Sequence, residues 1–173
     1  KMYKGQKVSD VVAAIKMFHR YNIQIHAMFI VGTDEEKGNA ADSICKFAWR
    51  HKVETIQILI SSPFPGTPLY DKLESKNRIL HKRWEEYDLH HCVVRQLNGK
   101  LKPEEIRRKS NQAMLDFFSW KYIARHTLKG PYYFFEDITK GFSFRDALHN
   151  SFFLAGLGVF ANYYLRKELQ KEI

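Results

Sequence analysis

The sequence predicts an α/β fold with two parallel strands in its first half and a mostly helical second half. Two β-prone apolar runs, residues 23–31 and 55–61, each follow a segment whose apolar residues recur at helical spacing. Helix and strand that alternate in this way are typical of a βαβ unit in a parallel sheet. After the proline-rich loop at residues 62–68 the sequence contains no further run of this kind. We therefore expect about two parallel strands with flanking helices, followed by a helical region.

The first half alternates helix and strand. A helix is expected to begin near Ser9, whose hydroxyl can cap it, with Asp10 in the first turn. A second helix is expected over residues 40–51, between the two strands, and the side chains of its predicted inner face are Ala41, Ile44, Cys45, Ala48 and Trp49. Two parallel strands alone do not form a stable covered sheet. Further strands are therefore expected from preceding sequence or from another chain.

The second half carries three predicted helices. A short one covers residues 69–75, and Pro103 followed by two carboxylates marks the start of a long one. The buried face predicted for the long helix consists of Ile106, Ala113, Phe117, Trp120 and Ala124. Gly130–Pro131 is expected to break this helix, and Ser143 with Asp146 is expected to cap a last helix that runs to about residue 170.

The composition is that of a folded protein with a basic surface. The chain has 173 residues, 45% of them hydrophobic, and 28 Lys and Arg against 19 Asp and Glu give a formal charge of +9. This excess favours anionic partners such as nucleic acid, phosphates or an anionic membrane. Two cysteines exclude a disulfide framework, so a reduced cytoplasmic location is expected. The longest apolar run, residues 152–161, is too short to span a bilayer, which needs about 20 residues.

Two loops that follow the predicted strands form the candidate site. Gly32–Glu36 follows the first strand and Ser61–Thr67 follows the second. Parallel α/β folds place their ligand sites at the carboxyl ends of the strands. Two interpretations stay open for each loop, a ligand-binding rim or a rigid turn that serves only the next helix. The presence of two such loops side by side favours a site.

Strand parity predicts which side chains face a ligand. Alternate residues of a strand point to opposite faces of the sheet, and one face of the pair collects the polar positions. The residues expected on this face, toward the interior of a barrel that accepts a polar ligand, are His26, Met28, Ile30, Gln57, Leu59 and Ser61. The alternative is that His26 and Gln57 are hydrogen-bonded core residues.

Three further segments have simpler explanations than a ligand site. His90-His91-Cys92 offers metal-ligating groups, but neighbours on an extended segment point apart, so no metal site is predicted. The basic stretch Arg107–Lys109 can grip phosphates, yet such charges more often form the solvated face of a helix. Residues 152–165 are apolar nearly all round, which indicates burial against other elements rather than insertion into a membrane surface. Gly156 and Gly158 would then allow close approach of a neighbouring helix.

The segment Met28–Glu35 resembles the GxIxGxxE strand-and-loop motif of the radical S-adenosylmethionine superfamily. The motif is matched at Ile30, Gly32 and Glu35, and Met28 replaces its first glycine. The loop at residues 62–70 is similar to the one that follows the sixth strand of that family's barrel. Residues 84–94 and 102–105 resemble family members that carry a cobalamin-binding domain before the radical domain. The resemblance covers roughly residues 5–125.

This resemblance implies the C-terminal portion of a partial (β/α)6 barrel. In the family a 4Fe-4S cluster, held by a CxxxCxxC loop, cleaves S-adenosylmethionine to a 5′-deoxyadenosyl radical for methyl transfer, cyclisation or a related reaction. The resemblance implies that Ile30 and Gly32 contact the adenine end of this cofactor and that Glu35 orders the loop. Gln57 and Ser61 are expected beside them. No catalytic residue is predicted within the chain.

Two substitutions test whether the Gly32–Glu36 loop contacts the cofactor. Because glycine lets the backbone approach a ligand closely, Gly32→Val is expected to weaken cofactor binding while the fold stays largely intact. Glu36 lies one residue past the motif, so Glu36→Ala is expected to have little effect.

The chain contains no CxxxCxxC motif, so the cluster ligands, and any cobalamin-binding domain, are expected in a preceding part of the same polypeptide. We interpret residues 1–70 as the end of the barrel, 71–130 as a connector with a long amphipathic helix, and 131–173 as a helical extension. Such a fragment is expected to be inactive alone. Its expected partners are the missing N-terminal part and a small-molecule or lipid-like substrate, while RNA and peripheral membrane contact stay open. Two alternatives also stay open: an RNA-binding module of a tRNA-modifying radical enzyme, and a non-catalytic interaction protein.

Overall fold

The computed structural model describes residues 5, 7–21, 23–34, 36, 40–97, 102–128 and 130–171. The chain divides into two compact units, Lys1–Met114 and Leu115–Ile173. The first unit holds α1 (Val8–Arg20), β1 (His26–Val31), α2 (Ala40–Arg50), β2 (Thr55–Ile60), α3 (Pro68–Glu74), the 3-10 turn η1 (Trp84–Glu86) and most of α4 (Pro103–Phe117). The second holds α5 (Trp120–Thr127), α6 (Gly130–Thr139) and α7 (Phe144–Lys171).

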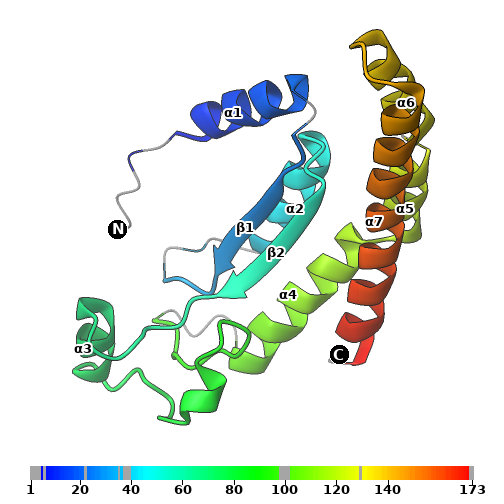
Figure 1. Cartoon of the computed structure of the whole chain (residues 1–173). Coiled ribbons are helices and arrows are strands. Elements are labelled where there is room, and N and C mark those ends of the chain that lie inside the picture. Colours follow the sequence, from blue (N-terminus) through cyan, green and yellow to red (C-terminus); the bar gives the residue numbers. More distant parts are fainter. Residues whose placement is uncertain are drawn as a thin grey trace. The chain divides into compact units, whose positions relative to one another are not determined.

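The two strands pair in parallel, in the register that runs from His26 opposite Thr55 to Val31 opposite Ile60 (Figure 1). One face of this sheet packs on α2, where the ring of Phe29 meets the ring of Phe47 edge-on with centroids 6.3 Å apart. The buried residues of β2 on that face are Ile56, Ile58 and Ile60. The predicted α/β class with two parallel strands is confirmed. The partial (β/α)6 barrel and the divisions after residues 70 and 130 stay predictions.

A buried carboxylate fixes the start of both strands. Glu54, which precedes β2, is only 7% exposed. Its Oε2 accepts a hydrogen bond from the Ile25 backbone N–H at 3.0 Å and lies 3.2 Å from Nε2 of His19 near the end of α1. A buried acceptor with partners on two other segments ties α1, β1 and β2 together. The sheet register is thus set from its amino end.

The segment that follows β2 has a small core of its own. Ile79 and Val94 form an isolated antiparallel bridge, and Arg95 N donates back to Arg78 O at 2.9 Å. The buried side chains gathered against this bridge are Tyr70, Leu73, Tyr87, Val93 and Val94. The segment from Ile79 to Val94, for which no helix or strand is predicted, is therefore ordered: its two ends pair through one antiparallel bridge and pack against α3.

The long helix predicted from Pro103 is interrupted. Its start is as expected, because Lys102 N donates to the Glu105 carboxylate at 2.9 Å. However, α4 ends at Phe117 and α5 begins at Trp120, so the helical phase changes between them. Phe117 is fully buried, whereas Trp120 is 60% exposed. The prediction of one continuous buried face on this helix is therefore wrong beyond Phe117, because a break between α4 and α5 changes the direction of every later side chain.

Two further helix boundaries differ from the sequence prediction. Gly130–Pro131 starts α6 rather than only ending its predecessor, since proline in the first turn lacks an N–H that would have no partner there anyway. At the other end of the chain α1 begins at Val8, one residue before the predicted cap Ser9. The Asp10 carboxylate accepts from Lys7 N at 3.1 Å and closes that first turn.

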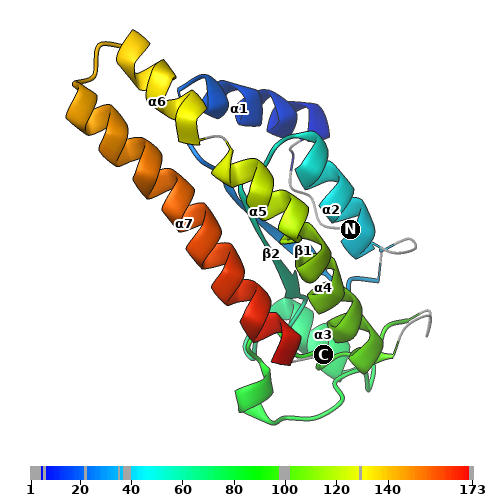
Figure 2. The same ribbon diagram turned by 90° about the vertical axis from the view of Figure 1, so that its right-hand side faces the viewer.

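The last helix begins as predicted but is not buried all round. Asp146 N donates to Ser143 Oγ at 3.2 Å, which confirms the capping pair. In the second unit α7 runs back along α6 and α5 (Figure 2) and buries Ala147 and Ser151. Phe152 and Phe160 are both 72% exposed, so the expected burial of residues 152–165 is wrong for them.

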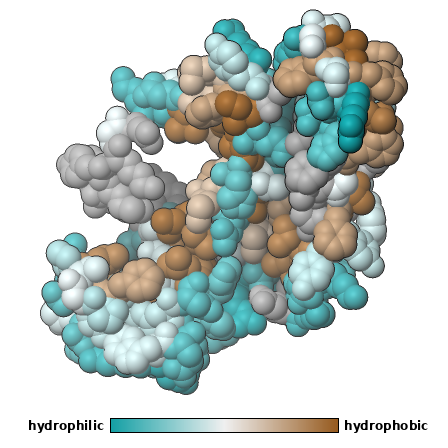
Figure 3. Space-filling model, viewed as in Figure 1, coloured by the Kyte–Doolittle hydropathy of each residue, from teal (hydrophilic) through white to brown (hydrophobic). Residues whose placement is uncertain are grey.

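The predicted close approach of a helix is not observed at Gly156, and the surroundings of Gly158 lie outside the described residues. A Cβ at Gly156 would meet nothing within 4 Å, so no neighbouring helix that the structure describes packs closely on it. Apolar side chains gather over the turn between α6 and α7, at the upper right of Figure 3. None of the helices in the described part of the chain is long and apolar enough to cross a membrane.

Candidate functional site

The carboxyl ends of β1 and β2 meet at one edge of the sheet, as the sequence predicted for a ligand rim. Ser61 N donates to Val31 O at 2.8 Å, so the two loops leave from adjacent positions. Gly32 follows β1 with φ of +81°, a conformation that favours glycine. The loop after β1 therefore depends on a glycine for its path.

Gly32 lies close to the protein's own side chains. A Cβ at this position would come within 3.4 Å of Ile60 and 3.7 Å of Ile106. These are ordinary van der Waals distances, but φ of +81° is a conformation that side chains rarely adopt, so a substitution here is expected to cost folding stability as well. Whether the Gly32 backbone also contacts a ligand stays a prediction.

A glutamate holds the turn, and it is one residue beyond the motif match. Glu36 Oε2 accepts the Gly32 backbone N–H at 2.6 Å. This carboxylate closes the turn around Gly32, a structural role that was not predicted from the sequence. The expectation that Glu36→Ala has little effect on cofactor binding stays a prediction. Glu35, the residue predicted to order the loop, lies outside the described residues. The sequence signal that could have identified Glu36 is a carboxylate four residues after a turn glycine.

The β1 loop is also held in place by Arg78, which lies 44 residues after Asp34 and was not predicted from the sequence. Arg78 is 8% exposed, and its Nη1 donates to Asp34 Oδ2 at 2.7 Å while Nη2 pairs with Oδ1. Arg78 Nε donates to Arg95 O at 2.8 Å, and Leu97 N donates to Asp34 Oδ1 at 3.1 Å. This hydrogen-bonded guanidinium lowers the pKa of Asp34 below its ordinary value of 3.8. The pair joins the β1 loop to the segment after α3.

The loop after β2 is mainly a rigid lead into α3. Pro63 is fully buried and Ser62 nearly so. Thr67 caps α3, since its hydroxyl donates to Phe64 O at 2.6 Å and accepts from Tyr70 N at 3.3 Å. These contacts favour the structural interpretation for Ser62–Thr67. Ser61 itself stays a candidate contact, because it lies at the rim and is half-buried.

Five of the six residues predicted on one sheet face lie in the strand pair and share the face opposite α2, while Ser61 follows the end of β2. Met28 pairs in register with Gln57, and Ile30 pairs with Leu59. Met28 and Ile30 are 61% and 50% exposed, while Leu59 is buried. This face therefore presents apolar side chains with the Gln57 amide between them. Its role as a barrel interior stays a prediction.

His26 is not the buried polar group that the sequence suggested. Its side chain is exposed, and Nδ1 lies 2.8 Å from Thr55 Oγ1 at the amino end of the strand pair. The backbone of β1 also has an open side. Thr55 N and Ser61 N both donate toward β1, so alternate residues His26, Met28 and Ile30 direct their backbone groups away from β2.

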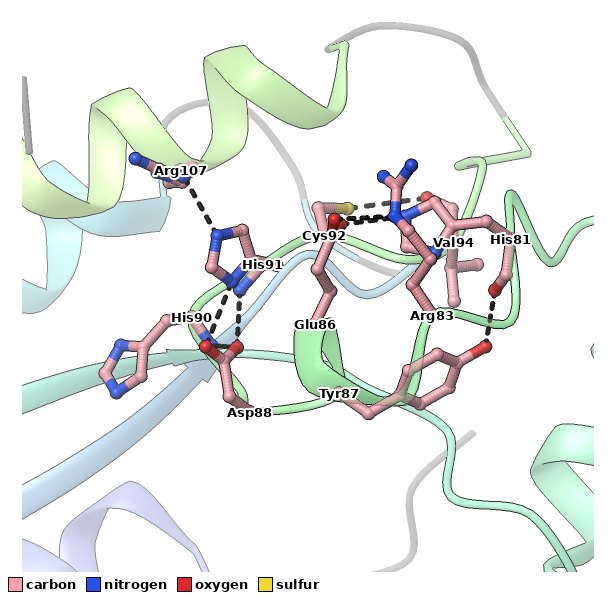
Figure 4. A network of polar contacts seen from close by, with 10 residues as sticks. All are labelled: His81, Arg83, Glu86, Tyr87, Asp88, His90, His91, Cys92, Val94 and Arg107. Atoms are coloured by element: carbon pink, nitrogen blue, oxygen red, sulfur yellow. Dashed lines mark hydrogen bonds and ion pairs between the residues drawn. The ribbon is translucent and has the colours of Figure 1, made fainter.

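A polar network lies beside the end of β2 (Figure 4). Ile60 N donates to Leu89 O at 2.6 Å, which places the segment Asp88–His91 against the strand. His91 Nδ1 lies 2.9 Å from Asp88 Oδ2, and Arg107 Nη1 lies 3.0 Å from His91 Nε2. Because arginine can only donate, Nε2 is the acceptor and Nδ1–H points to Asp88. Both ring nitrogens of His91 are thus engaged.

The two cysteines each donate a hydrogen bond to a backbone carbonyl oxygen. Cys92 is buried and its thiol donates to Val94 O at 3.4 Å, and burial raises the pKa of this thiol. Cys45 donates to Ala113 O at 3.0 Å. Within the described ranges no three His, Cys, Asp or Glu side chains are placed to hold a metal ion.

An open groove of about 560 Å³ runs between α1, β1 and α2. Its apolar walls come from Val11, Phe29 and Phe47, and Thr33 and Glu36 of the β1 loop also line it. Most of its lining lies on the helix-covered side of the sheet, and Ile30 of β1 also lines it. It shares the Gly32 loop with the face that carries Met28 and Ile30.

Comparisons with known proteins point to methyltransferases. Bacteriochlorophyllide d C-12(1)-methyltransferase of Chlorobaculum tepidum is 30% identical over 93 residues, which are 53% of this chain and 20% of the relative. Bacteriochlorophyllide d C-8(2)-methyltransferase of the same organism is 24% identical over 127 residues, 73% of this chain and 27% of the relative. An uncharacterized methyltransferase of Pyrococcus horikoshii is 25% identical over 118 residues, 66% of this chain and 25% of the relative.

These similarities are low but consistent with one another. All three relatives are methyltransferases by name, and the chain spans about a fifth to a quarter of their length. No family model and no solved structure matches the chain. The chain is therefore related in sequence to part of several methyltransferases.

Proposed function

We propose that this chain is part of a methyltransferase that uses S-adenosylmethionine by a radical mechanism. The observation that carries the proposal is the similarity to three methyltransferases over a stretch of up to 127 residues. The order of the Gly32 motif, the proline loop and the later motifs supports the radical type, as does the parallel strand pair that presents them.

The sheet face opposite α2 has the chemistry that an adenosyl group needs. Met28 and Ile30 offer exposed apolar surface, and Gln57, in register with Met28, offers an amide. Bound S-adenosylmethionine would supply the methyl group or the adenosyl radical. The proposed contacts are Ile30 by apolar packing, Gln57 and Ser61 by hydrogen bonds, and the Gly32–Glu35 loop by its backbone. Asp34 and Glu36 hold that loop in place rather than touch the ligand.

A 4Fe-4S cluster does not fit the residues of this chain. The chain has two cysteines, and both thiols are hydrogen-bonded to backbone carbonyls, Cys45 to Ala113 and Cys92 to Val94. A cluster of this kind takes three or four thiolates close together. Cluster ligands and a cobalamin site are therefore proposed for other parts of a longer polypeptide, which would also pair with the open edge of β1.

A small apolar molecule is the proposed substrate class. Two of the relatives are named for methylation of a bacteriochlorophyllide, which is not a nucleic acid. The exposed apolar face with Met28 and Ile30 suits such a ligand better than an RNA backbone, which binds through clusters of Lys and Arg.

The test is turnover of the complete polypeptide, prepared anaerobically and supplied with a reductant and S-adenosylmethionine. We expect 5′-deoxyadenosine to form. Gln57→Ala should weaken S-adenosylmethionine binding about tenfold, since it removes a hydrogen-bonding side chain from the site. Gln24→Ala, at the amino end of β1, is the matched control and should bind like the wild type.

The products separate the parts of the proposal. S-adenosylhomocysteine without 5′-deoxyadenosine, under every condition, would refute the radical mechanism but keep methyl transfer. Absence of S-adenosylmethionine binding by the cluster-loaded protein would refute the function altogether. Equal affinity in the Gln57 and Gln24 variants would refute the assignment of the sheet face.

A further inference from the structure

The side of α7 opposite the buried residues Ala147 and Ser151 is aromatic in the middle and basic at both ends. At 3.6 residues per turn, the residues within an arc of about 100° include Arg145, His149, Phe152, Phe160, Tyr163, Lys167 and Lys171. We name this arc the outer face of α7. The opposite side is buried through Ala147 and Ser151, and Arg166 donates to Leu115 O at 3.0 Å. The orientation of α7 within its unit is therefore fixed.

The aromatic residues of the outer face are exposed. Phe152 and Phe160 are 72% exposed, while Tyr163, 51% exposed, lies beside the Trp120 ring of α5 with centroids 6.3 Å apart. In the turn that leads into α7, Phe142 and Phe144 are also 49% and 67% exposed, and the Phe144 ring packs edge-on against Phe134 of α6. Exposed aromatic surface of this extent on one helix indicates a binding surface rather than ordinary solvent-facing residues.

The charges on the outer face are of one sign. Arg145 precedes the aromatic residues and Lys167 and Lys171 follow them, and Lys171 pairs with Glu168 at 2.7 Å. The acidic residues of α7 that the structure describes lie outside the arc, and Asp146 is engaged by Ser143 at 2.6 Å. The surface is thus complementary to an anionic partner.

We propose that the outer face of α7 docks on an anionic lipid bilayer. Aromatic side chains would enter the boundary between headgroups and acyl chains, while the long Arg145 and Lys167 side chains reach the headgroups. The described part of α7 is not apolar enough to cross the bilayer, so the helix would lie in its plane. A symmetric dimer through this face fits less well, because it would bring basic residues of two copies together.

The experiment is sedimentation of the whole chain with vesicles. One set is pure phosphatidylcholine and the other contains about one third phosphatidylglycerol. We expect at least tenfold tighter binding to the anionic vesicles. Phe152→Ser/Phe160→Ser should lose about tenfold or more in affinity, since both rings leave water on docking. Arg145→Gln/Lys167→Gln should lose a similar factor, for anionic vesicles alone.

Matched controls lie in the first unit. Phe64→Ser removes an exposed ring, and Lys72→Gln/Lys76→Gln removes two exposed charges, so both should bind like the wild type. Circular dichroism checks that each variant is folded. The proposal is overturned if the wild type does not bind anionic vesicles, or if the control variants lose as much vesicle affinity as the α7 variants. It is also overturned if light scattering shows a dimer that Phe152→Ser/Phe160→Ser dissociates.

Discussion

Replacement of Asp34 by asparagine tests whether a distant arginine holds the proposed cofactor loop. Asp34 and Arg78 are 44 residues apart in sequence and share two hydrogen bonds, one of them 2.7 Å long. In Asp34→Asn the side chain keeps its shape, but its NH2 group faces a guanidinium donor and its charge is gone. The buried Arg78 then lacks its counter-charge.

The expected cost follows from the geometry. A hydrogen bond to a charged group contributes about 1.5–3 kcal/mol, and loss of one partner of a buried pair costs more than loss of an exposed one. Arg78 is buried, but the Asp34 side chain is 35% exposed, so water screens part of the interaction. We therefore expect the free energy of unfolding to fall by about 2 kcal/mol. For a slope near 2 kcal/mol/M, the urea midpoint drops by about 1 M.

The pH dependence of the free energy of unfolding also tests the Asp34–Arg78 contact. The pKa of Asp34 is lower in the folded chain than in the unfolded one, chiefly through the Arg78 hydrogen bond. Its contribution to stability is therefore present at neutral pH and is lost as the pH falls below about 4 and through the lowered pKa. Urea unfolding followed by circular dichroism should show wild type and Asp34→Asn converging in acid. Exposed Glu85→Gln serves as control and should change stability by less than about 0.5 kcal/mol. Two results would refute a stabilising role of the Asp34–Arg78 pair: wild-type stability of Asp34→Asn at neutral pH, or a loss of stability that is as large in acid as at neutral pH.

Three further predictions concern the same unit. Gly32→Val should lower the free energy of unfolding by about 1–3 kcal/mol in thermal melts, because φ is +81°, a conformation that side chains rarely adopt; unchanged melting would contradict this. Glu36→Ala should lower it by about 1 kcal/mol while Glu36→Gln retains most of it, since a side-chain oxygen can still accept the Gly32 N–H. With iodoacetamide, the buried thiol of Cys92 should react more slowly than that of partly exposed Cys45, because burial raises the pKa of Cys92; mass spectrometry that finds Cys92 labelled first would contradict the structure.

Local signals were sufficient for the elements of the α/β unit. The strands at His26–Val31 and Thr55–Ile60 and the helix between them follow from periodicity and β-branched runs, which depend on a few neighbouring residues. The Ser143 cap of α7 was predictable for the same reason, since donor and acceptor lie three residues apart. The sheet parity of Met28 and Gln57 follows from the fixed alternation of a strand.

Contacts between distant segments were decided only by the tertiary structure. The sequence contains Asp34 and Arg78, but their pairing requires the chain to return past the β1 loop after α3, and no local pattern encodes that path. The exposure of Phe152 and Phe160 likewise depends on how much of α7 its two neighbouring helices cover, while periodicity records only that apolar residues are present. The sequence alone therefore determined which segments become helix or strand and which loop carries the family-like motif. Which carboxylate holds that loop, and which face of α7 stays open, depended on three-dimensional packing, because burial and ion pairing are properties of the assembled chain.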